Sequence, residues 1–439
     1  MKSKIIKTIK YLLISLLLFA SFILLINSRL FDEELNPEVI KLMQEKPMPK
    51  LEGNVFFGIM GLTAADEKDF MQAGYEIIKT YDENIKKTKN KSIYTLEKEV
   101  IAEILGTKNS TPDNELYEYY RCDVGSFCCL ETTIPNNILD SKRYKALIDR
   151  FQKLKQMSSF KPYEYFGTMG PYSQYSLLTH LSQVYLVNTY QTKSNRDFIL
   201  QLSDDFDFWQ NIASSDSYLI DKMVAIDLIK NDMFYLSEFI REKKTEHEDI
   251  NLIENLVKPL SKEVLSFEKV FKNEMKYSLN IFNEINADDF SLDSLLFQPN
   301  ATKNYYFKSF LNNVSISNLP LSKFIQKHKE KKPGPMKRNF KIHQLYNYLG
   351  KLFVDYTSSP AYSDYIAKAH DSNNMIRLVN LQFQIKQAGG EEFIDEILNK
   401  PENLNPYDNK PFIYNKENKT LSFECLFNPA KNFKCEIRI

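Results

Sequence analysis

The chain has 439 residues with 57 basic and 57 acidic side chains, so its formal net charge at neutral pH is zero. A balanced charge offers no electrostatic basis for binding nucleic acid, and we expect no nucleic acid partner. The 12 glycines, set against 26 tyrosines and 31 phenylalanines, argue against disorder and against a glycine-rich nucleotide-binding fold.

The most apolar segment is 11–26, YLLISLLLFASFILLI, which contains no charge, proline or glycine and follows four lysines. A bilayer crossing takes about 20 residues at a rise of about 1.5 Å per residue. Counted from Ile5, the run reaches 22 residues. The stems of Lys7 and Lys10 can lie along apolar surface while their ammonium groups reach the lipid headgroups. We therefore predict a transmembrane helix.

The end of this run distinguishes a membrane anchor from a cleaved signal peptide. A signal peptide has an apolar core of about 7 to 15 residues and then a small-x-small cleavage site. Cleavage after Ser28 would put Ile26 where a small residue is required, and cleavage near Ala20 would divide the apolar run. The sequence favours an uncleaved anchor within residues 1–28.

Charges around the anchor predict its orientation. The four lysines precede it, whereas a single Arg29 and then Asp32, Glu33 and Glu34 follow it. Positively charged residues stay on the cytoplasmic side of a membrane. We expect the N-terminus in the cytoplasm and the remaining chain, about 410 residues, on the other side.

Residues 29–53 are predicted to form an extended, proline-containing spacer between membrane and body. One short helix begins there at an Asn36 cap followed by Pro37, and it ends before Pro47. The next segment, 54–62, is apolar with two glycines and suits either a strand or the start of a closely packed helix.

Residues 54–400 are predicted to form an irregular antiparallel array of helices, which makes the chain mainly α. Apolar residues recur every three or four positions, as on the buried face of a helix. The clearest series begin at Phe198, Leu219 and Val264. Short polar connections favour antiparallel neighbours. No regular repeat is present.

A basic turn at 327–341, KHKEKKPGPMKRNFK, interrupts the array. Its proline–glycine–proline centre marks a turn. We expect a solvated loop. The alternative is an anion site for lipid headgroups or an acidic polymer.

The pattern changes to period two after Lys400. Short strands are predicted at 412–414, 420–424 and 434–437. Residues 401–439 are therefore expected to form a small β-hairpin or three-stranded element.

Five cysteines are too few for a disulfide scaffold, but each can pair on the oxidising side of a membrane. Cys425 and Cys435 flank the connection between the last two predicted strands and form the first expected pair. Cys122 with Cys128 or Cys129 is a second candidate pair. A bond between the adjacent Cys128 and Cys129 is not expected.

Standard catalytic motifs are absent. The chain has no Gly-x-Ser-x-Gly nucleophile turn, no phosphate-binding glycine loop before Lys351, and no His-Glu-x-x-His helix. The Glu246-His247-Glu248 sequence has the wrong spacing for a zinc site. We expect no cofactor and no bound metal.

Two histidines have neighbours that suit a function. His180 lies close to the apolar face of its helix and is expected to be a hydrogen-bonded core residue rather than a base. His370 beside Asp371 fits an imidazole oriented by a carboxylate, which a general base requires. The simpler interpretation of His370 is a cation near the end of a helix, where the helix dipole favours positive charge.

Asp204, Asp205 and Asp207 form the densest acidic cluster. Helical spacing places Asp204 and Asp207 on one face, while Phe206 and Trp209 point to the core. We expect a solvated face. Paired carboxylates for acid–base chemistry are the alternative.

Several segments, spread in order along nearly the whole chain, resemble a group of single-pass, inner-membrane-anchored bacterial envelope proteins with no established activity. These are the anchor followed by 54–62, then 207–225, 297–304, 348–353, 369–382 and 405–414. The resemblance implies that the membrane is the bacterial inner membrane and that the body is periplasmic.

The last of these segments, NPYDNKPFIY, also resembles the DP-x-x-x-x-P-x-x-Y hairpin that closes many secreted bacterial proteins, including some pseudopilins. Asn405 stands where that pattern has Asp, and Asp408 is the only carboxylate in the turn. Calcium takes about six to eight oxygen ligands, so we expect a structural turn rather than a calcium site.

Two functions of different class follow from these observations. The first is a non-catalytic, membrane-anchored binding or scaffolding protein whose partners are the lipid bilayer and envelope proteins or lipid. The alternative is an envelope hydrolase or lyase that uses Asp, Glu and His residues assembled by the fold. A cleft that joins His180 or His370 to two carboxylates would favour the enzyme. The absent motifs favour the binding protein.

Overall fold

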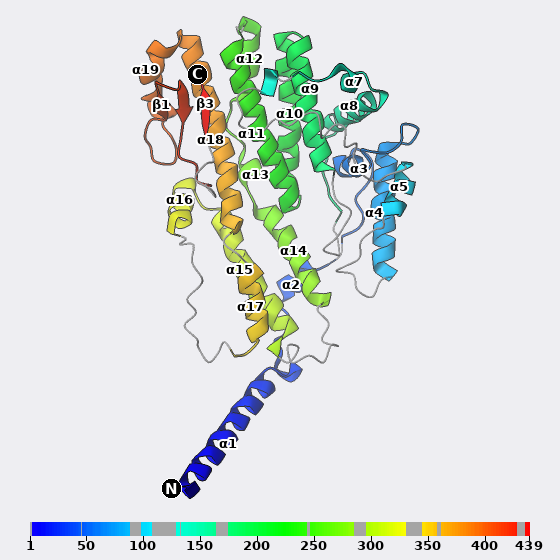
Figure 1. Ribbon diagram of the computed structural model, residues 1–439, viewed down its shortest axis with the longest axis vertical. Coiled ribbons are helices and arrows are strands. Elements are labelled where there is room, and N and C mark those ends of the chain that lie inside the picture. The colour runs from blue at the N-terminus through cyan, green and yellow to red at the C-terminus, as the bar shows by residue number, and fades with distance from the viewer. Residues whose placement is uncertain are drawn as a thin grey trace.

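Helices form the body of the molecule, and one long helix leaves it at the N-terminus (Figure 1). The computed structural model describes residues 2–44, 46–87, 98–107, 129–131, 133–163, 174–243, 246–284, 296–330, 345–357, 361–427 and 435–439. The predicted fold class is confirmed, because the chain is mainly helical, begins with an apolar helix and ends with a small antiparallel sheet.

The helices are labelled in chain order, with η for 3-10 helices. The first half contains α1 (Lys2–Ile26), η1 (Arg29–Phe31), α2 (Pro37–Leu42), α3 (Val55–Met60), α4 (Phe70–Lys87), α5 (Lys98–Leu105), η3 (Cys129–Glu131), α7 (Asn136–Leu139), α8 (Lys142–Lys155), α9 (Tyr175–Thr192) and α10 (Asn195–Ser214). The second half contains α11 (Leu219–Glu242), α12 (His247–Leu256), α13 (Lys262–Leu265), α14 (Glu268–Glu284), α15 (Pro299–Ser317), α16 (Leu321–Glu330), α17 (Tyr348–Thr357), α18 (Ala361–Ala388), η6 (Glu391–Phe393), α19 (Ile394–Leu398) and η7 (Pro401–Asn403).

Side-chain caps fix the start of several helices. Asn36 and Asn54 accept hydrogen bonds from the first backbone N–H groups of α2 and α3, which satisfies donors that a helix leaves unpaired. Ser194 and Asp197 form a reciprocal capping box at the start of α10. The helix expected to start at Asn36 is therefore confirmed, and segment 54–62, open between strand and helix, begins as a helix.

The upper part of the body is built around α11, which packs against α10 on one side and α18 on the other. These helices stand side by side in Figure 1, with α9 and α12 next to them, whereas α14, α15 and α17 lie in the lower part, toward α1. Trp209 is fully buried in α10, and the rings of Phe198 and Phe239 stack at 5.3 Å between α10 and α11. The predicted apolar faces are the ones that pack.

Buried cations close several helix C-termini. Lys222 donates to the carbonyls of Ala213 and Val264, both at 2.5 Å. Lys386 donates to the carbonyl of Lys243 at 2.6 Å, just beyond the end of α11. The last carbonyls of a helix have no partner within the helix, and the C-terminal end of the helix dipole is negative. An ammonium group there donates hydrogen bonds to these carbonyls and also offsets the negative end of the dipole. These lysines are structural.

The C-terminal sheet has strands β1 (Ile413–Asn415), β2 (Thr420–Ser422) and β3 (Glu436–Arg438) in the order β1-β2-β3, all antiparallel. Leu421 pairs with Tyr414 on one side and Ile437 on the other. β2 lies within its predicted segment, whereas β1 and β3 each extend one residue beyond the end of theirs. Gly389 and Gly390, both with positive φ near 120°, follow the end of α18.

Cys425 and Cys435 are joined by a disulfide, with their Cα atoms 5.8 Å apart. That separation lies in the usual range for a disulfide. Cys122 and Cys128, the second candidate pair, lie outside the described residues. Most of the basic turn, 331–341, also lies outside them.

Three local predictions differ from the structure. The segment 29–53, predicted as an extended spacer between membrane and body, packs partly against the body, since Val39 is fully buried. The helix expected after Ser261 is divided into α13 and α14, with Ser266 extended between them. His370 and Asp371 lie inside α18 rather than near its end, so the dipole interpretation of His370 is wrong.

Candidate functional site

The helix α1 is long and apolar enough to span a membrane. Its segment Lys4–Ile26 has 23 residues with a mean hydropathy of 2.5, and none of it is buried inside the structure. In Figure 1 it projects from the lower end of the body. The residues that join this helix to the body form the first candidate site.

Asn27, the first residue after α1, is only 2 % exposed. Its amide nitrogen donates to the carbonyl of Leu345 at 2.9 Å, and its oxygen accepts from the backbone N–H of Asn347 at 2.8 Å. A buried polar group left without a partner costs about 1 to 3 kcal/mol. These bonds therefore hold the residue that follows α1 at one place in the fold.

Gln298 and Asn347 extend this contact into α15 and α17. Gln298 donates from its side chain to the backbone carbonyl of Asn27, and its backbone N–H donates to Asn347 Oδ1 at 2.9 Å. The hydroxyl of Thr302 donates to the same oxygen at 3.0 Å. Gly350 packs so closely here that a Cβ would lie 2.0 Å from Thr302 Oγ1. The contact leaves no room for a side chain.

The acidic segment after α1 caps the start of α15. Asp32 accepts from the backbone N–H groups of Asn300 at 3.0 Å and Ala301 at 2.9 Å. A carboxylate is favoured at the positive N-terminal end of a helix. We call this set the α1 junction: Asn27, Asp32, Gln298, Thr302, Asn347 and Gly350. The α1 junction makes the end of α1 part of the folded body.

A second feature is an open cleft of about 350 Å³ between α8 and α10. Carboxylates and amides predominate in its lining, which consists of Gln152, Lys155, Gln156, Met157, Asp204, Asp207, Phe208 and Asn211. Ligand sites usually start at about 300 Å³. The cleft can hold a small polar group.

Asp204 and Asp207 are exposed at this cleft, whereas Phe206 and Trp209 are buried, as their spacing predicted. Partial desolvation by the cleft walls and then the nearby Asp204 carboxylate raise the pKa of Asp207. Two carboxylates on adjacent turns accept hydrogen bonds and favour a positive charge between them.

Asp205, the middle member of the predicted acidic cluster, lies on the other side of α10 and is fully buried. Its Oδ2 accepts from Ser182 Oγ at 2.6 Å and from the indole N–H of Trp209 at 2.9 Å. Its Oδ1 lies 3.5 Å from Lys155 Nζ, and both side chains are at most 3 % exposed. The expected solvated face therefore describes Asp204 and Asp207 but not Asp205.

Asp232 of α11 completes this buried charge cluster, which consists of Lys155, Asp205 and Asp232. Burial and then the Asp205 carboxylate raise the pKa of Asp232 well above its usual value, against the opposing effect of Lys155. Asp232 is 1 % exposed. Asp232 thus holds its proton to higher pH. The core therefore contains the Lys155–Asp205 ion pair beside a neutral carboxyl group and not two carboxylates that repel each other.

Two further buried acids cap the start of α11. Asp221 accepts from the backbone N–H of Tyr218 at 2.9 Å and from the hydroxyl of Tyr175 at 2.6 Å. Glu274 accepts from the backbone N–H of Leu219 at 2.8 Å. Burial raises the pKa of Asp221 to about 6 and that of Glu274 to about 7. Each acid accepts from a backbone N–H at the start of α11, so their role is structural.

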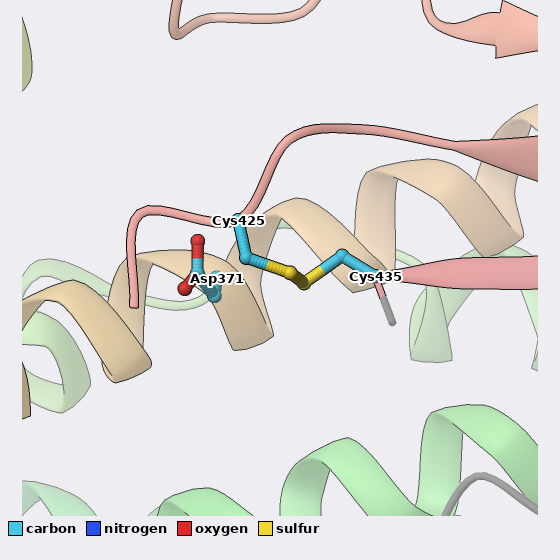
Figure 2. A group of neighbouring side chains, drawn as sticks. All are labelled: Asp371, Cys425 and Cys435. Atoms are coloured by element: carbon cyan, nitrogen blue, oxygen red, sulfur yellow. A yellow bond between two sulfur atoms is a disulfide. The ribbon is translucent and has the colours of Figure 1, made fainter. Parts of the chain in front are cut away.

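Asp371 lies beside the disulfide, as Figure 2 shows. Its ligand atom and the sulfurs of Cys425 and Cys435 lie within 4.8 Å of one another. The sulfurs are bonded to each other, so they are not the thiolates that bind metals. Asp371 instead accepts from the backbone N–H groups of Leu426 and Phe427, each at 2.9 Å. Asp371 thereby holds the backbone of Leu426 and Phe427 beside the disulfide.

The two singled-out histidines lie away from the cleft. His180 is half-buried and its Nδ1 lies 2.7 Å from the carbonyl of Ser176, one turn earlier in α9. Burial lowers the pKa of His370 to about 4, and its ring packs 5.3 Å from that of Phe324. A core role fits both residues. Among the described residues that line the cleft, none is a histidine.

Sequence reasoning found Asp204 and Asp207 but missed the α1 junction and Lys155. Asn27, Gln298 and Asn347 are separated by up to 320 residues, and no local pattern connects them. One local signal was available. Pro299 marks the start of a helix, which makes the preceding Gln298 a candidate for contacts at the helix end.

Together the fold and these sites define a helical body joined to an N-terminal helix of membrane-spanning length and carrying a small polar cleft. No protein-family model matches the chain, and comparison with curated proteins and with solved structures finds no similar one.

Proposed function

We propose that this chain is a single-pass, membrane-anchored protein of the bacterial envelope that binds or scaffolds other molecules and catalyses no reaction. Its N-terminus lies in the cytoplasm, α1 crosses the inner membrane, and the helical body lies in the periplasm. The α1 junction is the observation that carries this proposal. Asn27, 2 % exposed, ties α1 to α15 and α17, whereas a cleaved signal peptide would contribute nothing to the folded body.

Charge and disulfide support the orientation. Four lysines precede the apolar run, and Asp32, Glu33 and Glu34 follow it. The Cys425–Cys435 disulfide suits an oxidising compartment such as the periplasm. The resemblance to single-pass envelope proteins supports a bacterial origin.

The state of the buried acids supports binding over catalysis. Asp221 accepts a hydrogen bond from the N-cap backbone N–H of its own helix, and Glu274 and Asp371 accept from backbone N–H groups of other elements. The two acids of the buried charge cluster are closed off from solvent, since Asp205 and Asp232 are at most 1 % exposed. None of these acids is available to a substrate. Partners therefore bind at exposed surfaces, and the bilayer is the partner of α1.

The cleft is the proposed site for a small polar partner group. Its carboxylates and amide oxygens accept hydrogen bonds, so it suits a group rich in hydroxyl or amino donors, as on a glycan or an amine-bearing lipid headgroup or peptide. A photoreactive amino acid at Asp204 should crosslink to a partner in native membranes. The same amino acid at Lys400, 43 % exposed outside the cleft, is the control. Equal yields at both positions would contradict a specific site.

Anchoring has its own test. The intact mass of the protein extracted from membranes should include residues 1–28, and a periplasm-dependent reporter fused after Ile439 should be active. A mature chain that begins after Ser28, or a reporter active only in the cytoplasm, would overturn the proposed topology.

The paired carboxylates Asp204 and Asp207 favour one alternative, an envelope hydrolase or lyase. The raised pKa of Asp207 suits a group that donates a proton. Product analysis with cell-wall glycans and peptides tests it: turnover that Asp207→Asn abolishes would establish the enzyme, while binding without turnover supports the binding protein.

A further inference from the structure

Large apolar side chains gather at the end of the body from which α1 emerges. Outside α1, ten such side chains are exposed in the described part of the chain. Five of the ten lie next to the α1 junction. We call these five the juxtamembrane patch: Leu30, Phe31, Tyr348, Leu352 and Phe353. A contiguous exposed apolar surface marks an interaction site.

Two contacts bring the halves of this patch together across the sequence. The hydroxyl of Tyr346 donates to the carbonyl of Phe31 at 2.9 Å. Glu33 lies close enough to Lys351 to act electrostatically on its ammonium group. The first turns of α17 therefore lie beside η1, directly after α1.

The pattern of α17 is unusual for a surface helix, because large apolar side chains lie on its outer side, beside Lys351 and Asp355, as well as on its inner side. Gly350 and Val354 are buried against the body. Tyr348, Leu352 and Phe353 are 36 %, 39 % and 41 % exposed. A helix with only water outside carries polar residues there, so the outer face of α17 has a partner.

We infer that this partner is the lipid bilayer that α1 crosses, and that the juxtamembrane patch lies in its interfacial region. The inference rests on the proposed membrane anchor. Leu30 is 90 % exposed only four residues after the end of α1, so it cannot be far from the bilayer surface. Headgroup regions add about 5 to 8 Å to each side of the hydrocarbon core. Leu352 lies one helical turn beyond Tyr348, a rise of about 6 Å along the helix axis. That rise is no larger than the thickness of the headgroup region.

Position and composition both favour lipid over a protein partner. The α1 junction fixes the end of α1 against Asn347, the residue before Tyr348. Tyrosine is typical of the membrane interface, where its amphipathic ring sits at headgroup level. Phenylalanine and leucine form the apolar face of helices that lie in the plane of that interface. The body is therefore held down on the membrane by two contacts, α1 and the patch, rather than hanging from one helix.

Tryptophan quenching by brominated lipid tests this inference on the full-length protein. The chain has one tryptophan, Trp209, which is fully buried and gives the baseline emission. Leu352→Trp and, independently, Leu30→Trp each add an exposed indole to the patch. The proteins are reconstituted in nanodiscs of phosphatidylcholine or of the same lipid brominated at shallow acyl positions, which report on the patch, or at deep acyl positions, which report on the middle of α1.

We expect the emission added by either substitution to be lost in brominated nanodiscs. Ile413→Trp is the matched control, since Ile413 is a 59 % exposed apolar residue of β1, far from α1 in Figure 1; its emission should persist. Leu17→Trp, inside α1, reports on the anchor itself. Quenching at 17 with none at 352 and 30 overturns the inference and leaves the anchor intact. No quenching at 17 refutes the anchor, and the inference with it.

Discussion

The buried charge cluster makes the sharpest stability prediction. Lys155 Nζ lies 3.5 Å from Asp205 Oδ1, with side chains 3 % and 1 % exposed. Lys155→Met removes the cation and leaves the carboxylate of Asp205 in the core with only Ser182 and Trp209 as donors. Breaking a buried pair in this way costs about 3 to 5 kcal/mol.

The expected shift in melting temperature follows from chain size. A body of about 410 residues has an unfolding entropy of roughly 0.9 kcal/mol/K. A loss of about 4 kcal/mol should therefore lower Tm by about 4 °C. Trp209, whose indole donates to Asp205, provides a local fluorescence signal for the same transition.

A nearby surface pair supplies the control. Lys153 Nζ lies only 2.8 Å from Asp149 Oδ2 on the same helix, but the side chains are 58 % and 63 % exposed. Solvent screens that pair, so Lys153→Met should cost less than about 1 kcal/mol although its distance is shorter. Burial rather than distance therefore decides which of the two substitutions costs more stability.

A double variant separates charge from packing. Lys155→Met with Asp205→Asn removes both members of the ion pair, and replacement of a whole buried pair is often close to neutral. We expect most of the lost stability to return, with a coupling of about 2 kcal/mol or more. A Lys155→Met variant as stable as Lys153→Met, or additive losses in the double variant, would show that the buried ion pair does not stabilise the core.

Three further predictions concern other parts of the fold. Gly350→Ala should destabilise the protein in thermal melts, although glycine to alanine inside a helix normally gains about 1 kcal/mol, because the new Cβ would lie 2.0 Å from Thr302 Oγ1; a higher Tm would contradict the close packing of the α1 junction. Glu274, with a pKa raised from 4.5 to about 7, keeps its proton in the folded state, so its contribution is fully present below pH 4.5 and is lost as pH rises to 7. Relative to wild type, Glu274→Gln should therefore gain about 3 kcal/mol in urea unfolding between those pH values, and parallel pH curves would exclude this. Reduction of Cys425–Cys435, which closes a loop of sequence separation 10, should cost about 2 to 3 kcal/mol and raise hydrogen exchange at Leu426; unchanged exchange would show that Asp371 alone holds the loop.

Local sequence signals predicted the elements well, because they depend on near neighbours. The Asn36 cap and the apolar faces of α10 and α11 act within a few residues of where they stand. The helix after Ser261 was the exception. Its apolar spacing continued across Ser266, but backbone at that residue is extended, which no periodicity reports.

The candidate sites were predictable only in part. Helical spacing separated exposed Asp204 and Asp207 from the core, yet it did not reveal that Asp205 faces inward, because its partners Ser182 and Lys155 come from other helices. His370 had the residue types of a catalytic pair with Asp371, but its ring packs against Phe324 and Asp371 is bonded to the backbone N–H groups of Leu426 and Phe427, which favours structural roles for both.

By itself, the sequence determined an apolar N-terminal helix, its basic flank, a mainly helical body and the cysteine pair near the C-terminus. These follow from composition and from spacing along one element. Only the tertiary structure decided that the end of α1 is locked to α15 and α17 through Asn27, that Lys155 and Asp205 pair in the core, and that α17 exposes an apolar face beside α1. Those features depend on side chains brought together from distant positions, and burial changes what a polar group costs.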